Sequence, residues 1–261
     1  MYRIGTTSYI IPDEILPNVD YLGGRVSDIQ LVLFETDEHG SNLPDETLRS
    51  ALRERAARFG LTYTVHLPLD LRLADGGEAT HVSLIKARRV IEATRDLAPA
   101  AYTLHLDAGR LPPPWGACRD NPLTLRAWQD QAARALERVA GWVPSPGLLC
   151  VENLEKWAPE AFEAVLDRVP VSRTADIGHL WLEGRDPLPS LRKWLPRTRV
   201  VHLHGVGTRD HQSLLRMTAA QLEPVVKLLK AEFNGVLTLE VFNEQDLAES
   251  LEALRRAEET V

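Results

Sequence analysis

Residues 171–204 read VSRTADIGHLWLEGRDPLPSLRKWLPRTRVVHLH, and this stretch shows a pattern that recurs along the whole chain. It opens with the short run Val171–Asp176 and closes with the run Val200–His204, both rich in β-branched and aliphatic residues. Runs of this length that are apolar on both faces are typical of strands covered by helices. Each run ends on a side chain that can bind a metal ion. The stretch therefore predicts two parallel strands with polar carboxyl ends.

Six further runs of the same kind occur along the chain, and they alternate with amphipathic stretches of helical period. The other predicted strands are Tyr2–Thr7, Asp28–Phe34, Thr62–Leu67, Ala101–Leu106, Leu148–Glu152 and Val236–Val241. The predicted helices include Leu43–Phe59, Val82–Leu97, Leu125–Trp142, Ala219–Phe233 and Gln245–Glu258. Eight strands alternating with helices within 261 residues predict an α/β fold, a single (β/α)8 TIM barrel. A doubly wound sheet is the alternative, with its ligand site at one switch point.

The connections between these elements show no break in composition that would mark a domain boundary, so we expect one domain over residues 1–261. Pro44 and Asp45 suit a first helical turn, Gly60 suits a helix end, and Asn243 suits the N-cap of the last helix. Three proline-rich stretches are interpreted as loops: Leu111–Trp115, Val143–Gly147 and Asp186–Pro189.

The composition excludes several classes of protein. Hydrophobic residues make up 44% of the chain and charged residues 26%, which is ordinary for a globular protein and excludes a disordered one. The net charge of −7 disfavours a broad basic face, so we expect no nucleic-acid partner. Two cysteines are too few for a disulfide framework or a thiolate zinc site. Neither a membrane-length apolar run nor a signal-peptide core occurs, which leads us to expect a cytoplasmic protein without membrane contact.

Six of the eight histidines fall in, at or just beyond the carboxyl end of a predicted strand, and three carboxylates fall at matching ends. The set is His66, His105, Glu152, Asp176, His179, His202, His204, His211 and Glu240. In a parallel barrel all these positions meet at one face. Imidazole with carboxylate suits Zn²⁺, Mn²⁺, Fe²⁺ or Co²⁺, and one ion takes only about four to six ligands. The set therefore predicts two to three divalent transition-metal ions, Zn²⁺ foremost, and favours hydrolysis over structural metal binding.

Two details of this set concern neighbouring residues and loops. His202 and His204 lie two residues apart on one strand, so both side chains point to the same side. We expect one to be a ligand and the other to support it, with His202 favoured as the ligand. Loops at the same face supply candidates for stacking on a substrate or binding its phosphate. These candidate substrate-binding residues are Trp115, Trp181, Arg72, Arg110 and Arg209.

The motifs around these residues resemble those of the xylose-isomerase-like barrel superfamily, and the resemblance covers nearly the whole chain. They are Thr-Val-His66-Leu-Pro, Leu-His105-Leu-Asp, Val-Glu152-Asn, Ala-Asp176-Ile-Gly-His179, Val-His202-Leu-His204 and Leu-Glu240-Val. Two chemistries of the superfamily compete. Similarity to sugar isomerases and epimerases implies one ion, with the two glutamates moving a proton of the sugar. Its implied ligands are Glu152, Asp176, a histidine of the seventh strand and Glu240.

Similarity to endonuclease IV implies instead a three-metal phosphodiesterase site, and the full histidine set favours this reading. The implied first group is His66, His105 and Glu152. The implied second group is Glu152, Asp176, His202 or His204, and Glu240. His179 and His211 would hold the third ion. The family pattern has an aspartate two residues before the last histidine, where this chain has Arg209, and this departure puts the third ion in question.

Three further segments resemble a narrower group, the cobamide-remodelling phosphodiesterases. They are IGTTSYIIPDEILPN at residues 4–18, LVLFE at 31–35 and YTVHLPLDLR at 63–72. The resemblance implies hydrolysis of the nucleotide loop of a corrinoid at the phosphate–ribose linkage, leaving cobinamide phosphate and an α-riboside. Glu152, Glu240 and His179 are the predicted catalytic residues, and the expected partner is a small corrinoid or phosphorylated sugar-like substrate. A DNA-repair nuclease and a non-catalytic binder are the remaining alternatives.

Overall fold

Eight parallel strands close into a barrel in which neighbours in sequence are neighbours in space. The computed structural model describes residues 1–36, 40–74, 81–106, 122–155, 157 and 159–261. The barrel strands are β1 (Arg3–Thr7), β2 (Asp28–Val32), β5 (Thr62–His66), β6 (Tyr102–His105), β7 (Leu149–Glu152), β8 (Ser172–Asp176), β9 (Thr198–Leu203) and β10 (Val236–Leu239). The closed topology confirms the predicted TIM barrel and excludes the doubly wound sheet.

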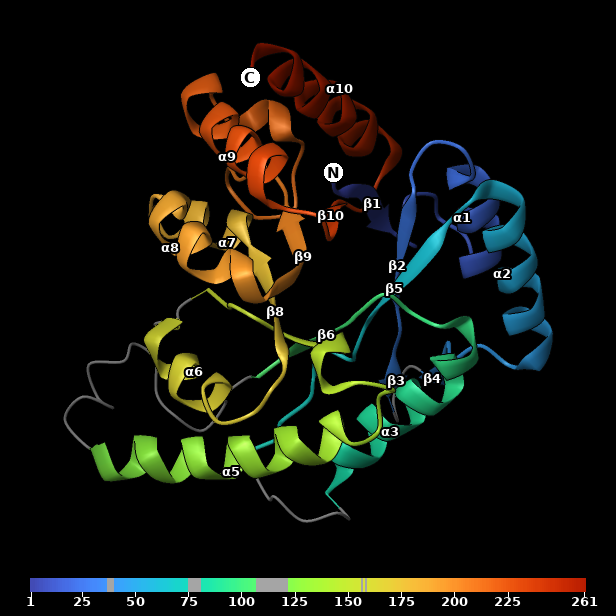
Figure 1. Cartoon of the computed structure of the whole chain (residues 1–261). Coiled ribbons are helices and arrows are strands. Elements are labelled where there is room, and N and C mark those ends of the chain that lie inside the picture. The colour runs from blue at the N-terminus through green and yellow to red at the C-terminus, as the bar shows by residue number, and fades with distance from the viewer. Residues whose placement is uncertain (37–39, 75–80, 107–121, 156, 158) are drawn as a thin grey trace.

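Helices surround the barrel and cover the outer faces of its strands (Figure 1). They are α1 (Ile15–Leu22), α2 (Glu46–Phe59), α3 (Val82–Thr94), α5 (Pro122–Ala140), α6 (Pro159–Leu166), α7 (Ile177–Leu182), α8 (Pro187–Trp194), α9 (Ala219–Glu232) and α10 (Glu244–Thr260). Because both the outer and inner sides of the strands are covered, strand residues such as Ile29, Leu104 and Val201 are fully buried. Among the described residues, no helix combines the length and the apolar character that crossing a bilayer requires.

Local signals set the ends of several helices. The side chain of Asp45 accepts a hydrogen bond from the amide of Leu48 (2.8 Å), so α2 begins at Glu46 and not at the predicted Leu43. Gly60 ends α2 in the left-handed conformation, with φ of 68°. The predicted N-cap of α10 is confirmed, because the Asn243 side chain accepts from the amide of Asp246 (2.8 Å).

One predicted loop is wrong. Asp186–Pro189 leads into helix α8, because Asp186 caps the amide of Leu188 (3.0 Å) and Pro187 occupies the first turn, where its missing N–H costs no hydrogen bond. Trp181, predicted in a loop, lies in the short helix α7. The loop over residues 143–147 enters the 3-10 turn Pro146–Leu148, and the predicted loop over residues 111–115 lies outside the described residues.

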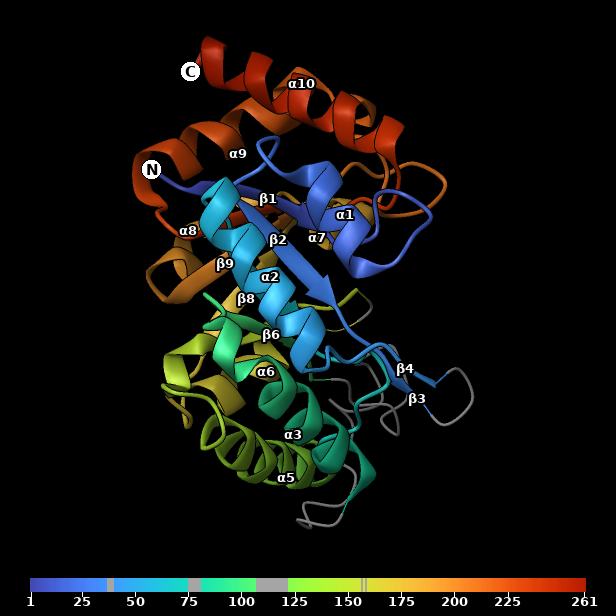
Figure 2. The ribbon, with the colours of Figure 1, turned by 90° about the vertical axis from the view of Figure 1, so that its right-hand side faces the viewer.

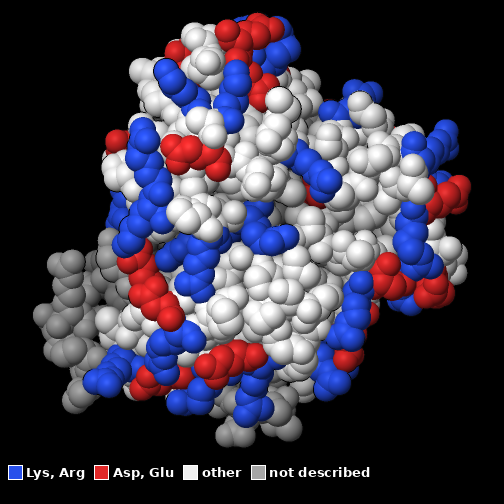
Figure 3. Space-filling view, viewed as in Figure 1, with Lys and Arg blue, Asp and Glu red and all other residues white. Residues whose placement is uncertain are grey.

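The two ends of the barrel differ in what they carry. The chain enters the barrel at the N-terminal end, and the unpredicted pair β3 (Glu35–Thr36) and β4 (Gly40–Ser41) projects at the opposite end (Figure 2). Figure 3 views the N-terminal end and shows acidic and basic side chains interspersed around its periphery. The carboxyl ends of all eight strands face away from that view, so every residue predicted at a strand end is brought to the other mouth.

The barrel interior near the N-terminal end contains polar side chains around the buried carboxylate of Asp28. The carboxylate of Asp28, at the start of β2, is fully buried and accepts hydrogen bonds from the hydroxyls of Thr62 (2.6 Å) and Thr64 (2.8 Å). Thr103 of β6 and Thr174 of β8, the two strands that flank β7, share a hydrogen bond of 2.7 Å inside the barrel. Burial raises the pKa of Asp28 to about 6, although the two hydroxyls oppose the increase.

Candidate metal centre

The carboxyl ends of six strands bring the predicted ligands together. His66, His105, Glu152 and Asp176 are the last residues of β5, β6, β7 and β8, His202 lies in β9, and Glu240 directly follows β10. Three further histidines come from the α7 turn and the end and following loop of β9. Donor atoms of these nine residues form three groups in which all atoms lie within 4.8 Å of one another. The groups are His66, His105 and Glu152; Glu152, Asp176, His202 and Glu240; and His179, His204 and His211.

The first group converges on one carboxylate oxygen. His66 Nε2 and His105 Nε2 lie 3.3 and 3.1 Å from Glu152 Oε2. The other ring nitrogen of His66, Nδ1, is 2.7 Å from the carbonyl oxygen of Leu67, which can only accept, so Nδ1 carries the proton. In the neutral ring Nε2 then points a lone pair at a carboxylate. That arrangement is stable only with a proton or a metal ion between them.

The second group places one imidazole among three buried carboxylates. His202 Nδ1 is 2.9 Å from Glu152 Oε1, 3.0 Å from Glu240 Oε2 and 3.7 Å from Asp176 Oδ2. Its Nε2 is 2.8 Å from the side-chain oxygen of Gln30. The amide nitrogen of Gln30 donates to Glu240 Oε1 (3.1 Å), which orients its oxygen toward the ring. Gln30 thus fixes the proton on Nε2 and leaves the lone pair of Nδ1 facing the carboxylates.

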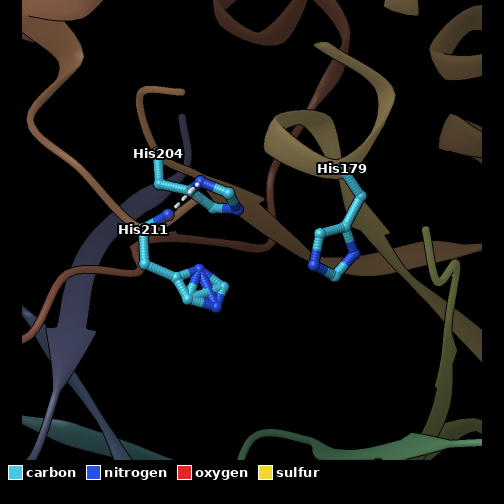
Figure 4. Close-up of side chains that lie close together, drawn as sticks. All are labelled: His179, His204 and His211. Atoms are coloured by element: carbon cyan, nitrogen blue, oxygen red, sulfur yellow. Dashed lines mark hydrogen bonds between the residues drawn. The ribbon is translucent and has the colours of Figure 1, made fainter. Parts of the chain in front are cut away.

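The third group consists of imidazoles alone (Figure 4). His179 Nδ1 lies 2.9 Å from the carbonyl oxygen of Asn153, so it donates there and Nε2 keeps a lone pair. The His204 ring contacts the rings of His211 and His179, with centroids 4.4 and 5.8 Å away. The amide of His211, a non-glycine residue in the left-handed region (φ 51°), donates to His204 Nδ1 (3.0 Å). The three rings therefore border one small space.

A glycine makes room for the third group. A Cβ atom placed on Gly178 would come within 2.0 Å of His204 Cε1 and 2.2 Å of its Nε2. Any side chain there would push the ring out of its position, because such approaches are far below van der Waals contact. The Asp-Ile-Gly-His turn therefore carries two ligand candidates and the space that a third one fills.

The buried carboxylates of the centre are ionised and therefore need positive charge nearby. Burial by itself raises the pKa of Glu240, and neighbouring His202 outweighs it and lowers the pKa to about 2. The pKa of Glu152 is likewise held well below its usual range, mainly by His202 and His105. Without metal, protonated imidazoles must therefore balance the buried carboxylates. Burial opposes that charging, yet the carboxylates raise the pKa of His202 well above its usual value.

Three buried polar atoms without a hydrogen-bond partner show whether the site fits metal ions. Asp176 Oδ2, His204 Nε2 and His211 Nδ1 have no hydrogen-bond partner among the described residues. His204 Nε2 lies 3.3 Å from Asp176 Oδ1, without the geometry of a hydrogen bond. Buried polar atoms in folded proteins nearly always have partners, so these atoms are the ones a bound cation would satisfy. Nitrogen and carboxylate donors in this mixture fit Zn²⁺ and its neighbours in the first transition series.

The centre opens into a cavity of about 170 Å³. Glu152, His179 and Glu240, the three predicted catalytic residues, line it. Val32, Leu69 and Phe242 form an apolar part of the wall, and Leu69 and Phe242 remain 60% and 42% exposed. A substrate at this mouth would therefore meet ligand groups on one side and an apolar rim on the other.

None of the predicted substrate-binding residues that the structure describes is among the residues lining this cavity. Arg209 is exposed in the loop that leads to His211, and Arg72 is half-buried beyond β5, with its Nη1 3.4 Å from the carbonyl oxygen of Leu71. Trp181 is buried and faces a different cavity, which Pro187 and Pro224 also line. Arg110 and Trp115 lie outside the described residues. Their roles stay predictions.

Several residues of the centre were missed at the level of sequence. Gln30 is the one amide within the apolar run Asp28–Val32, and that position was its only signal. Asn153 pairs its side chain with the backbone of Asp176, donating to the carbonyl oxygen (2.9 Å) and accepting from the amide (2.8 Å). Glu155 Oε2 lies 3.5 Å from His179 Nε2. Asn153 and Glu155 follow the Glu152 motif closely, but ordinary loop residues give the same pattern.

The comparison with protein families agrees with this architecture. Residues 27–257 match the model of the xylose isomerase-like TIM barrel family, and the chain belongs to that family. No curated protein matches the chain. The predicted resemblance to this superfamily is thereby confirmed.

Solved structures show the same fold at low sequence identity. A D-tagatose 3-epimerase-like protein is 19% identical with a TM-score of 0.77, covering 99% of this chain and 98% of its own. Endonuclease IV from Thermus thermophilus is 18% identical with a TM-score of 0.74, covering 99% and 100%. The TTHB071 protein of the same organism, in a form soaked with ZnCl2, is 19% identical with a TM-score of 0.68, covering 100% and 98%. Epimerases and nucleases are thus both among the structures this chain resembles.

Proposed function

We propose that the chain is a metal-dependent hydrolase of phosphodiesters. The observation that carries this proposal is the sharing of Glu152 by two ligand groups, beside a third group of imidazoles. A single ion needs only the second group. Five buried or half-buried imidazoles at the mouth would then have no ion to bind, namely His66, His105, His179, His204 and His211. A cluster of ions suits phosphoryl transfer, in which charge is spread over several oxygens.

The chain itself would supply the framework of the reaction. Bound divalent ions of this kind supply Lewis acidity to phosphoryl oxygens and lower the pKa of water. Glu152 turns Oε2 toward His66 and His105 and Oε1 toward His202, so its carboxylate sets the spacing of two groups. Gln30 and Asn153 keep imidazole lone pairs aimed at the site. Glu240 and His179 line the cavity with Glu152, and we assign all three to contact with the reacting phosphoester.

For the substrate we propose the nucleotide loop of a cobamide, cleaved at its phosphate–ribose linkage into cobinamide phosphate and an α-riboside. The support is the similarity of residues 4–18, 31–35 and 63–72 to the cobamide-remodelling group, together with the apolar rim of the cavity. Phe34 is 39% exposed and follows β2 at the same end of the barrel, with its ring centroid 5.5 Å from that of Tyr9 and the two rings tilted by 54°. Exposed apolar side chains beside a metal centre fit a phosphoester that carries a bulky ring system.

The test is product analysis with a matched pair of variants. Purified protein is incubated with a cobamide and Zn²⁺ or Mn²⁺, and the products are identified by liquid chromatography and mass spectrometry. We expect equal amounts of cobinamide phosphate and α-riboside from wild type and from Glu54→Gln, an exposed site on α2, and neither from Glu152→Gln. If the protein cleaves an abasic-site oligonucleotide and leaves the cobamide intact, the proposed substrate is wrong but the proposed phosphodiesterase activity is retained. If the protein cleaves neither the cobamide nor the oligonucleotide, the proposed phosphodiesterase activity is contradicted.

A sugar isomerase or epimerase is the second candidate. The observation that favours it is that Glu152, Asp176, His202 and Glu240 form a complete four-residue group on their own. This function predicts about one metal ion per chain and exchange of solvent deuterium into a ketose, which proton NMR would detect. The hydrolase predicts two or three ions and no exchange.

A further inference from the structure

A second cavity, larger than the one at the metal centre, lies at the opposite end of the barrel. It has a volume of about 940 Å³ and lies among the N-terminal ends of β1, β8, β9 and β10. Three arginines line it: Arg3, Arg197 and Arg199. No aspartate or glutamate is among the described residues of its wall. In a chain with a net charge of −7, this wall is therefore locally cationic.

The three guanidinium groups are available to a ligand. None of them forms an ion pair with a carboxylate anywhere in the described part of the chain, whereas arginines on the outer helices, such as Arg53 and Arg255, are paired. Arg199 makes one long contact, from Nη2 to the carbonyl oxygen of Ala100 (3.3 Å). The charge of Arg3 acts on the buried carboxylate of Asp28, but that carboxylate accepts its hydrogen bonds from Thr62 and Thr64.

Arg197 is held in place by the backbone. Its Nε donates to the carbonyl oxygen of Val171 (2.6 Å) and its Nη2 donates to that of Val169. The side chain is therefore ordered before any ligand arrives, and Nη1 is left without a partner among the described residues. An ordered guanidinium loses less conformational entropy when it binds an anion than a free one does.

The strand register places the other two arginines across one strand from each other. Arg3 of β1 pairs with Val236 of β10, and Val236 pairs with Val200 of β9, next to Arg199. β10 lies between β1, which carries Arg3, and β9, which carries Arg199. The distance between β1 and β9 is therefore two strand spacings, or about 10 Å. Both residues are exposed, and Figure 3 shows basic side chains around the middle of this face. Two anionic groups on one small molecule could each meet a guanidinium at this separation.

We propose that this cavity binds a small anion carrying two or more phosphate groups. Its volume is within the range of small-molecule sites, and guanidinium groups bind phosphate through paired hydrogen bonds. The site is separate from the metal centre and does not depend on the function proposed for it.

Calorimetric titration with two probes tests the proposal. Fructose 1,6-bisphosphate serves as the bisphosphate and fructose 6-phosphate as the monophosphate, both with the full-length protein. We expect saturable binding of the bisphosphate that is at least about 10-fold tighter than that of the monophosphate. In Arg3→Glu/Arg199→Glu this binding should weaken by at least about 10-fold. The control Arg58→Glu/Arg192→Glu makes the same change in charge at exposed arginines outside the cavity and should bind like wild type.

Two results would overturn the proposal. One is equal affinity of the bisphosphate for wild type, the Arg3/Arg199 variant and the control, because binding would then take place elsewhere, including at the metal centre. The other is no binding of either probe. If Arg3→Glu/Arg199→Glu does not fold, judged by circular dichroism, Arg3→Gln/Arg199→Gln replaces it with the same expectation.

Discussion

Both ends of the barrel contain buried carboxylates, but the two ends differ in whether the chain itself supplies hydrogen-bond partners for them. At the N-terminal end the chain satisfies Asp28 with the hydroxyls of Thr62 and Thr64, and its pKa rises to about 6. At the carboxyl end Asp176 keeps an oxygen without a hydrogen-bond partner in the described chain, and the pKa of Glu240 falls to about 2. A buried acid that its own chain satisfies is part of the structure. A buried acid that lacks a partner marks a place for a cation.

Removing the shared carboxylate should have the largest effect. In Glu152→Gln the side chain keeps its size but loses the charge that faces His66, His105 and His202. We expect phosphodiesterase activity to fall by about 10²–10⁴-fold and bound metal to fall by at least one equivalent per chain. Activity assays and inductively coupled plasma mass spectrometry measure the two effects. Glu54→Gln is the control, and a Glu152 variant with unchanged metal content would refute the assignment of Glu152 as a shared ligand.

A methyl group at Gly178 should weaken metal binding only by the third ligand group, His179, His204 and His211. The Cβ would lie 2.0 Å from His204 Cε1, so the ring must leave its position. We expect Gly178→Ala to weaken one metal equivalent by about 10–100-fold in competition with a fluorescent chelator, with the other equivalents unchanged. Gly147→Ala is the matched control, because its Cβ meets nothing closer than 3.8 Å. Identical metal binding by both variants would show that His204 has no part in holding an ion.

At the N-terminal end of the barrel, the substitution Asp28→Asn should change how the free energy of unfolding depends on pH. The folded pKa of about 6 lies above the ordinary value of 3.8, so the folded state binds this proton more tightly than the unfolded one. The resulting stabilisation is complete below pH 3.8 and is lost as the pH rises through 6. Between about pH 4.5 and about pH 8 wild type should therefore lose about 2 kcal/mol of unfolding free energy relative to Asp28→Asn. Urea titrations across this range measure the difference, and parallel curves would contradict a raised pKa.

The sequence was sufficient to predict the barrel and to place the nine candidate ligands at one mouth, because both depend on local patterns. That these residues bind metal ions stays a prediction. A short apolar run followed by histidine or a carboxylate shows at once where a strand ends and which atoms it delivers to the mouth. The xylose isomerase-like family match agrees with that prediction. Helix α8 was missed because Pro187 reads as a loop residue unless the capping role of Asp186 is recognised.

The division of the ligands into groups could not be predicted from spacing. His202 and His204 lie two residues apart, yet His202 lies among the carboxylates and His204 among the imidazoles, where the missing side chain of Gly178 leaves room for its ring. Gln30 acts through a ring 172 positions away in the chain, and no local pattern reveals such a contact. Long-range packing decides these features.

Anomalous diffraction from crystals soaked in ZnCl2, recorded at the zinc edge, shows whether metal ions bind at the carboxyl mouth of the barrel. We predict peaks at the carboxyl mouth within about 2.0–2.3 Å of donor atoms of Glu152, with further density beside His179 and His211. The N-terminal end, with its arginines and satisfied Asp28, should show none. A mouth without any anomalous peak, with His202 still hydrogen-bonded to Glu152 and Glu240, would contradict the account.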